Sequence, residues 1–181
     1  KVLSSKSDTT IAARNISERG PGLEGNYRKL HGDLSNIDFL YFHSDKEYKE
    51  LYSDQKDKRW AFKYTDKYQL NENVQVEVDW SKASDSLVLR DISGEITSIG
   101  SEREQYLNQN ISITGEFKNL ILKIEQEKNQ SLNPLLTNGY EKSPSVDLSF
   151  FKNIGNFLFR ENLNVSSVSY THLRAHETLE N

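Results

Sequence analysis

The side chains of this chain that could act chemically include two pairs of histidine and aspartate. His31 precedes Asp33 by two positions, and His43 precedes Asp45 by two positions. An imidazole beside a carboxylate can act as a general base when both groups converge in space on a nucleophile. The chain has no Gly-x-Ser-x-Gly motif to present such a nucleophile. We therefore interpret both histidines as turn residues beside Asx-type turns, and the sequence predicts a protein that is not an enzyme.

A second pair of histidines could bind a metal ion. His172 and His176 are four residues apart, a spacing that places two imidazoles on one face of a helix. A zinc protease of the His-Glu-x-x-His type needs glutamate after the first histidine, and this chain has Leu173 there. We expect no metal site at these residues.

Three aspartates raise the possibility of a calcium site. Asp79, Asp85 and Asp91 lack the Asp-x-Asp-x-Asp-Gly spacing of a calcium-binding loop, so we interpret them as part of a solvated strand face. The absence of cysteine excludes disulfides and thiolate metal ligands. The sequence thus predicts no cofactor.

The composition excludes further classes of protein. Lys and Arg number 23 against 27 Asp and Glu, which gives a net charge of −4 and argues against a nucleic-acid partner. No apolar stretch reaches the roughly 18 residues that a membrane-spanning helix requires. The chain begins at Lys1 and shows no signal peptide, so we expect a piece of a longer protein.

Alternating apolar and polar residues predict a sheet. Residues 73–80 place Val74, Val76, Val78 and Trp80 on one side and polar residues on the other, as in an antiparallel strand with one wet face. Further strands are predicted over 36–43, 60–64, 87–99, 110–117 and 119–125. Residues 45–55 fit a short helix or a hairpin tip, and 147–159 fit a helix or a strand. We predict an all-β or β-dominated fold, an antiparallel sheet of about seven strands with little helix, either a curved one-sided sheet or a sandwich.

Polar and glycine-rich ends bound this domain. Residues 1–25 are punctuated by Gly20, Pro21, Gly22 and Gly25, and we interpret them as a polar linker or the start of a fragment. Residues 26–165 form the predicted β-rich domain. In the tail over 166–181, the letters YTHLRAHET resemble peptides translated from sequencing adapters. We therefore treat the tail as non-native or disordered.

Aliphatic side chains recur along the predicted strands and would form one continuous apolar face. A second sheet could cover this face as a sandwich core, or the face could remain open as a groove for lipid tails. Burial in such a groove would contribute about 0.8 kcal/mol per methylene group. The candidate residues for the groove are Val74, Val76, Val78, Leu87, Leu89, Ile111, Ile113, Leu120, Leu122 and Ile124.

Aromatic residues support an alternative function. Trp60, Trp80 and nine tyrosines could stack on sugars in a carbohydrate- or protein-binding β-sandwich of a surface or secreted protein. Both tryptophans are in phase with Phe62, Tyr64 and Val78 on the side expected to be buried, so we favour a place in the core.

Three strand-like segments, Leu87–Ile99, Asn110–Glu125 and Asp147–Phe159, together resemble the AsmA-like, translocation-and-assembly-module B group of envelope proteins. That group has long stretches of repeated β-structure and no active site. The resemblance implies a non-enzymatic protein on the periplasmic side of the cell envelope. It also implies phospholipid or envelope proteins as partners, and a role in moving phospholipid or assisting outer-membrane assembly.

Overall fold

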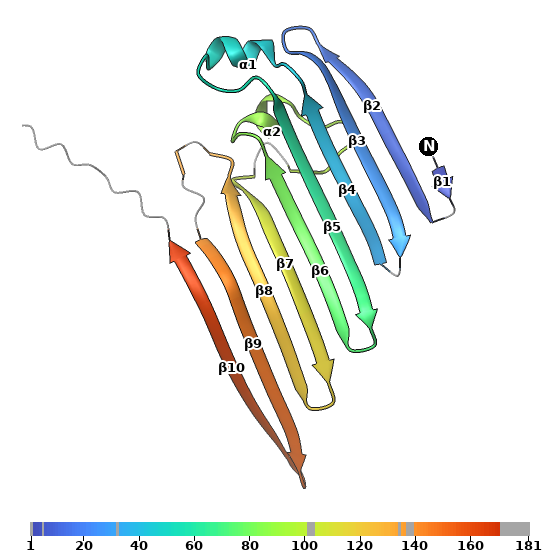
Figure 1. Ribbon diagram of the computed structural model, residues 1–181, viewed down its shortest axis with the longest axis vertical. Coiled ribbons are helices and arrows are strands. Elements are labelled where there is room, and N and C mark those ends of the chain that lie inside the picture. Colours follow the sequence, from blue (N-terminus) through green and yellow to red (C-terminus); the bar gives the residue numbers. More distant parts are fainter. Residues whose placement is uncertain are drawn as a thin grey trace, which may run out of the picture.

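The chain forms a single antiparallel sheet in which strands lie side by side in chain order. The computed structural model describes residues 2–4, 6–31, 33–100, 104–133, 135–136 and 140–170. These contain a ten-stranded sheet that begins with β1 at one edge and ends with β10 at the other (Figure 1). Its strands are β1 (Val2–Ser4), β2 (Ser7–Ile16), β3 (Gly20–His31), β4 (Asp33–Phe42), β5 (Arg59–Asn71), β6 (Val74–Ala83), β7 (Tyr106–Phe117), β8 (Leu120–Ser131), β9 (Tyr140–Ile154) and β10 (Phe157–Tyr170).

The predicted β-dominated antiparallel sheet is confirmed, with more strands than the approximately seven expected; of the two predicted forms, the structure has the one-sided sheet. The ambiguous segment 147–159 is the hairpin of β9 and β10, which turns at Gly155 with a φ of 61°. Residues 45–55 contain the helix α1 (Lys46–Leu51) between β4 and β5. The only other helix in the described part of the chain is α2 (Val88–Asp91). Neither of these helices is long and apolar enough to span a membrane.

The prediction of a polar linker over residues 1–25 is wrong, because β2 and the first half of β3 lie there, and the two strands pair along their lengths. The glycines of β3 have a packing role. A Cβ on Gly22 would lie 2.6 Å from the Phe42 ring, and one on Gly25 would lie 2.3 Å from the Phe39 ring. Glycine inside a strand often marks such a close approach rather than a loop. The predicted tail also begins later than expected, since β10 extends to Tyr170; residues 171–181 lie outside the described residues.

The two faces of the sheet differ in chemistry. On the face that we call the polar face, the chain from β6 to β7 crosses behind the strands in the view of Figure 1. We call residues 84–100 of this connection the crossover segment. It helps to bury a small hydrophobic core at the helix end of the sheet, which comprises Leu40, Phe42, Ala61, Ala83, Val88, Leu89, Ile92, Ile99 and Leu107.

The predicted strand over 87–99 is wrong, since these residues form α2 and the rest of the crossover segment. Val88 and Ile92 are almost fully buried in the small core, and Leu89 is 5 % exposed. Apolar residues at positions 88, 89 and 92 fit one helical turn against a core.

Candidate functional site

The apolar residues predicted to share one face do meet across neighbouring strands. In an antiparallel sheet, residues directly opposite each other project to the same side. The registers align Tyr68, Val76, Ile113, Ile124, Val146 and Val165 in one row across six strands. A second row contains Val74, Gly115, Leu122, Leu148 and Leu163, and Leu120 lies between Phe117 and Phe150 in a third. We call this side of the sheet the apolar face.

No second sheet covers the apolar face among the described residues, because all ten strands belong to one sheet. Ile113 is 43 % exposed, Ile124 is 40 % and Val165 is 59 %. A sandwich core would bury such residues. The fold is therefore the one-sided sheet rather than the sandwich.

Two of the predicted groove residues lie elsewhere. Leu87 directly precedes α2 and Leu89 is within it, with exposures of 7 % and 5 %. Leu89 is part of the crossover segment, and its side chain packs in the small hydrophobic core between this segment and the sheet. The remaining eight candidates lie on strands β6, β7 and β8 and face the same side.

Aromatic residues continue the apolar face toward β4. Trp60 lies opposite Tyr41, and Phe62 lies opposite Phe39. On β6, which pairs with the other edge of β5, Trp80 lies opposite Tyr64. Both tryptophans are partly exposed, so they belong to the open face and not to the core that the sequence favoured.

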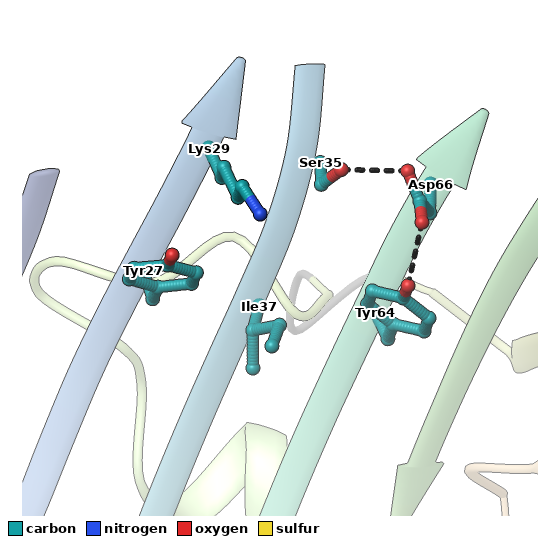
Figure 2. A pocket seen from close by; sticks show the side chains of 6 residues that line it. All are labelled: Tyr27, Lys29, Ser35, Ile37, Tyr64 and Asp66. Carbon is teal, nitrogen blue, oxygen red and sulfur yellow. Dashed lines mark hydrogen bonds between the residues drawn. The ribbon is translucent and has the colours of Figure 1, made fainter. Parts of the chain in front are cut away.

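A hollow of about 260 Å³ interrupts the apolar face over β3, β4 and β5 (Figure 2). Polar and aromatic groups surround its aliphatic base. The lining residues are Tyr27 and Lys29 from β3, Ser35 and Ile37 from β4, and Tyr64 and Asp66 from β5.

Hydrogen bonds hold the Asp66 carboxylate at one side of the hollow. The Ser35 hydroxyl donates to Oδ1 at 2.6 Å, and the Tyr64 hydroxyl donates to Oδ2 at 2.7 Å. The hydrogen bond to Asp66, followed by burial, raises the pKa of Tyr64 to about 12, because ionisation would remove the donated proton beside a carboxylate. The hollow therefore presents a neutral tyrosine hydroxyl and a fixed carboxylate at neutral pH.

On the polar face, the fully buried carboxylate of Glu24 binds the crossover segment. Its Oε1 accepts hydrogen bonds from the backbone N–H groups of Glu95, Ile96 and Thr97 and from the Thr97 hydroxyl. Arg14 donates to Oε2 at 3.3 Å. Burial acts to raise the pKa of Glu24, but the hydrogen bonds from Ile96, Thr97 and Glu95 outweigh it and lower the pKa.

A buried guanidinium group joins the two helices to the sheet. Arg59 is fully buried at the start of β5 and pairs with Asp85 through two hydrogen bonds, of 3.0 Å from Nε and 2.7 Å from Nη2. Its Nη1 lies 3.0 Å from carboxylate oxygens of both Asp45 and Asp91. The Arg59 Cζ atom also lies 4.0 Å from the centroid of the Tyr48 ring.

Burial acts to lower the pKa of Arg59, but the paired carboxylates raise it above its ordinary value. For Asp85, burial acts to raise the pKa and the bonds from Arg59 outweigh this, so the pKa is lowered. This is an ion cluster with its donors and acceptors matched, and it serves to position α1 and α2.

This cluster is not predicted by the sequence. The interpretation of Asp85 and Asp91 as solvated strand residues is wrong, because both bind Arg59. Of the three aspartates, only Asp79 lies on a strand, and its buried Oδ1 has no hydrogen-bond partner in the described part of the chain. Arg59 follows the charged residues Asp57 and Lys58 and directly precedes Trp60, and nothing in this pattern predicts that the arginine is buried.

In the described part of the chain, the structure does not place the predicted turn histidines beside a catalytic nucleophile. His43 follows β4, and its Nδ1 lies 3.2 Å from the Tyr41 hydroxyl. Its neighbour Asp45 caps α1 and binds Arg59 and Arg19 instead. The side chain of His31, and the whole of His172 and His176, lie outside the described residues.

Comparison with known proteins identifies a family and several relatives to which this chain is similar. The sequence profile of the LptD family, described as LPS transport system D, matches residues 57–178. The chain is 23% identical over 142 residues to the LPS-assembly protein LptD of Ectopseudomonas mendocina (strain ymp), and 25% identical over 140 residues to that of Pseudomonas entomophila (strain L48). It is 26% identical over 149 residues to the LPS-assembly protein LptD of Salmonella paratyphi A (strain ATCC 9150 / SARB42).

These alignments cover 78%, 77% and 81% of this chain but only 15%, 15% and 19% of the respective relatives. The chain thus spans less than a fifth of the length of these curated relatives. The family is of the broad class that the resemblance implied, envelope proteins of lipid transport and assembly, but it is not the AsmA-like group. Because the profile match covers most of the chain, the chain belongs to the LptD family.

Proposed function

We propose that this chain is part of a non-enzymatic LPS-assembly protein of the cell envelope, and that its apolar face contacts lipid acyl chains. Membership of the LptD family and the names of its relatives support the assembly role. The observation that carries the lipid contact is the uncovered row from Tyr68 to Val165 across six strands. The periplasmic side and phospholipid transfer rest only on the resemblance to AsmA-like proteins.

The apolar face has the size and chemistry for acyl chains. Six strands span about 24 Å at a spacing of about 4.8 Å, and Val74 to Val78 extends about 14 Å along β6. A patch of this size on a protein surface marks an interaction site. Since each methylene group buried there contributes about 0.8 kcal/mol, one acyl chain of ordinary length would supply several kcal/mol without polar contacts.

Intrinsic fluorescence can test this proposal, because both tryptophans of the chain, Trp60 and Trp80, lie on the apolar face. The full chain is mixed with phosphatidylcholine vesicles whose acyl chains carry bromine, a contact quencher, and with unbrominated vesicles. We expect quenching only with brominated acyl chains. Equal emission in both kinds of vesicle would contradict the proposal.

Paired substitutions on the two faces give the control. Val76→Glu and Ile113→Lys introduce charge on the apolar face, and we expect them to weaken vesicle binding about tenfold or more, since a charge is costly to place in hydrocarbon. Gln75→Glu and Thr114→Lys introduce the same charges on the polar face one residue away, and binding should be retained. Equal loss from both pairs would show that the apolar face has no special role.

A further inference from the structure

We propose that the hollow on the apolar face binds the zwitterionic headgroup of an aminophospholipid, with the lipid phosphate against Lys29 and the lipid ammonium against Asp66. This inference rests on the proposed function, because it takes the adjoining apolar face as the place of the acyl chains. Figure 2 shows the polar groups of the hollow on three neighbouring strands, with Ile37 between them.

Lys29 supplies the positive charge of the hollow. Its side chain is exposed on β3, and Figure 2 shows it extending toward β4. It takes part in no ion pair among residues of the described ranges. An ammonium group at the border of an apolar face attracts the phosphate of a lipid whose acyl chains lie on that face.

Asp66 supplies the negative charge on the opposite side. The hydroxyls of Ser35 and Tyr64 hold its two oxygens in place, and a carboxylate can accept further hydrogen bonds beyond these two. A primary ammonium can therefore donate to it at little cost in ordering, because the carboxylate is already positioned.

The arrangement of the two charges selects the class of headgroup. Lys29 and Asp66 lie on β3 and β5, which are separated by β4 and thus by about 10 Å between backbones. A purely anionic headgroup would meet the Asp66 carboxylate as a like charge, whereas an aminoalkyl phosphate presents one charge to each side. The Tyr27 and Tyr64 rings, with an apolar body and a polar hydroxyl, suit the boundary between headgroup and acyl chain.

The acyl chains would continue onto the apolar face without a break. Ile37 at the base of the hollow lies opposite Tyr64, which lies opposite Trp80 on β6. Along β6 from Trp80, the next residues on the same side are Val78 and Val76, which lie opposite Ile111 and Ile113 of β7. One lipid can thus place its headgroup in the hollow and its chains on the face already assigned to lipid.

Native mass spectrometry of the full chain tests the headgroup site. The chain is released from detergent micelles that contain equal amounts of phosphatidylethanolamine, phosphatidylcholine and phosphatidylglycerol with the same acyl chains. We expect phosphatidylethanolamine to be retained about fivefold over phosphatidylglycerol, the difference that one partly exposed charge contact can supply. Equal retention of the three lipids, or preferred retention of phosphatidylglycerol, would overturn the proposal.

Variants assign the preference to the hollow. Asp66→Asn should abolish the preference, because the Asp66 carboxylate is the group that distinguishes an ammonium headgroup from an anionic one. Lys29→Ala should lower the retention of all three lipids, because each carries a phosphate, and Lys29 is exposed, so this variant should fold. Lys82→Ala removes an exposed lysine on the same face of β6, opposite Phe62, and should keep the preference. A preference that survives Asp66→Asn, or lipid retention that is unchanged in Lys29→Ala, would contradict the site.

Bromine quenching separates this proposal from the function on which it rests. Quenching of Trp60 and Trp80 without any headgroup preference would reject the headgroup site alone. Absence of quenching together with absence of retained lipid would reject both.

Discussion

Glu24 binds Thr97 twice, although the two residues are 73 positions apart in the chain: Oε1 accepts from the Thr97 N–H at 3.0 Å and from its hydroxyl at 2.8 Å. With the N–H groups of Glu95 and Ile96 on the same oxygen, this carboxylate fastens the crossover segment to the polar face. The sheet thus carries a segment of its own chain on one face, whereas the other face is open.

Substitution of Glu24 by glutamine should loosen the crossover segment. The amide oxygen is a weaker acceptor than the carboxylate and leaves buried N–H groups poorly satisfied, so we expect a loss of about 1–3 kcal/mol in the free energy of unfolding. Amide hydrogen exchange at residues 95–97 should accelerate together with this loss. Glu95→Gln is the control, because the Glu95 side chain is 70% exposed; unchanged exchange in Glu24→Gln would contradict the role of Glu24.

The lowered pKa of Glu24 makes part of the stability dependent on pH. The folded pKa lies below the ordinary value of 4.5, so the unfolded state binds more protons between the two values and stability rises with pH there. The contribution is complete above about pH 4.5 and is lost as the pH falls through the folded pKa. Urea unfolding at several pH values should show that the difference between wild type and Glu24→Gln shrinks on acidification. A constant difference would contradict this linkage.

Removal of the buried guanidinium group should destabilise the chain strongly. Arg59→Met leaves the carboxylates of Asp45, Asp85 and Asp91 without their common partner, and breaking such a cluster costs about 3–5 kcal/mol. Chemical denaturation gives the measurement. Arg28→Met removes the exposed pair with Asp8 and should cost less than about 1 kcal/mol. Similar losses in both variants would show that the buried cluster contributes no more than a surface pair.

Where β6 and β7 separate, the side chain of Gln130 makes the hydrogen bonds to Ala83 of β6 that a backbone partner on β7 would otherwise make. Its side-chain amide accepts from the Ala83 N–H at 2.9 Å and donates to the Ala83 carbonyl at 2.8 Å, beyond the last paired residues Trp80 and Gln109. Gln130→Ala leaves both backbone groups of Ala83 unsatisfied, and we expect a loss of about 1–3 kcal/mol. Gln126→Ala on the same strand is the control, and a thermal unfolding midpoint equal in both variants would refute the bridging role.

The Tyr64 hydroxyl should ionise only near pH 12, because its hydrogen bond to Asp66 opposes loss of the proton. Asp66→Asn removes the negative charge and should bring the pKa of Tyr64 down toward the ordinary value of 10.0. NMR titration of chain labelled at the tyrosine ring carbons can follow this residue. Asp33→Asn, at an exposed carboxylate near the start of β4, should leave it unchanged. A wild-type Tyr64 that ionises near pH 10 would disprove the pairing.

Several features of the fold were predictable because they are local. Alternation from Val74 to Trp80 needs only the period of a strand, in which successive side chains point to opposite sides. The same period placed Ile111 and Ile113, and Leu120, Leu122 and Ile124, on single faces of their strands. The glycines of β3 were misread because Gly22 and Gly25 gain their meaning only from the rings of Phe42 and Phe39 on the next strand.

The sequence by itself therefore determined a β-dominated chain with one apolar side to its best strands. The tertiary structure alone decided that no second sheet covers this side among the described residues, that Leu87 and Leu89 are buried beside or within α2 and not on this side, and that Lys29 and Asp66 flank one hollow. It also decided that Arg59 meets Asp45, Asp85 and Asp91. The physical reason is that alternation follows from the geometry of one strand, whereas these contacts depend on strand register and on a long connection, which only the pairing of distant segments can set.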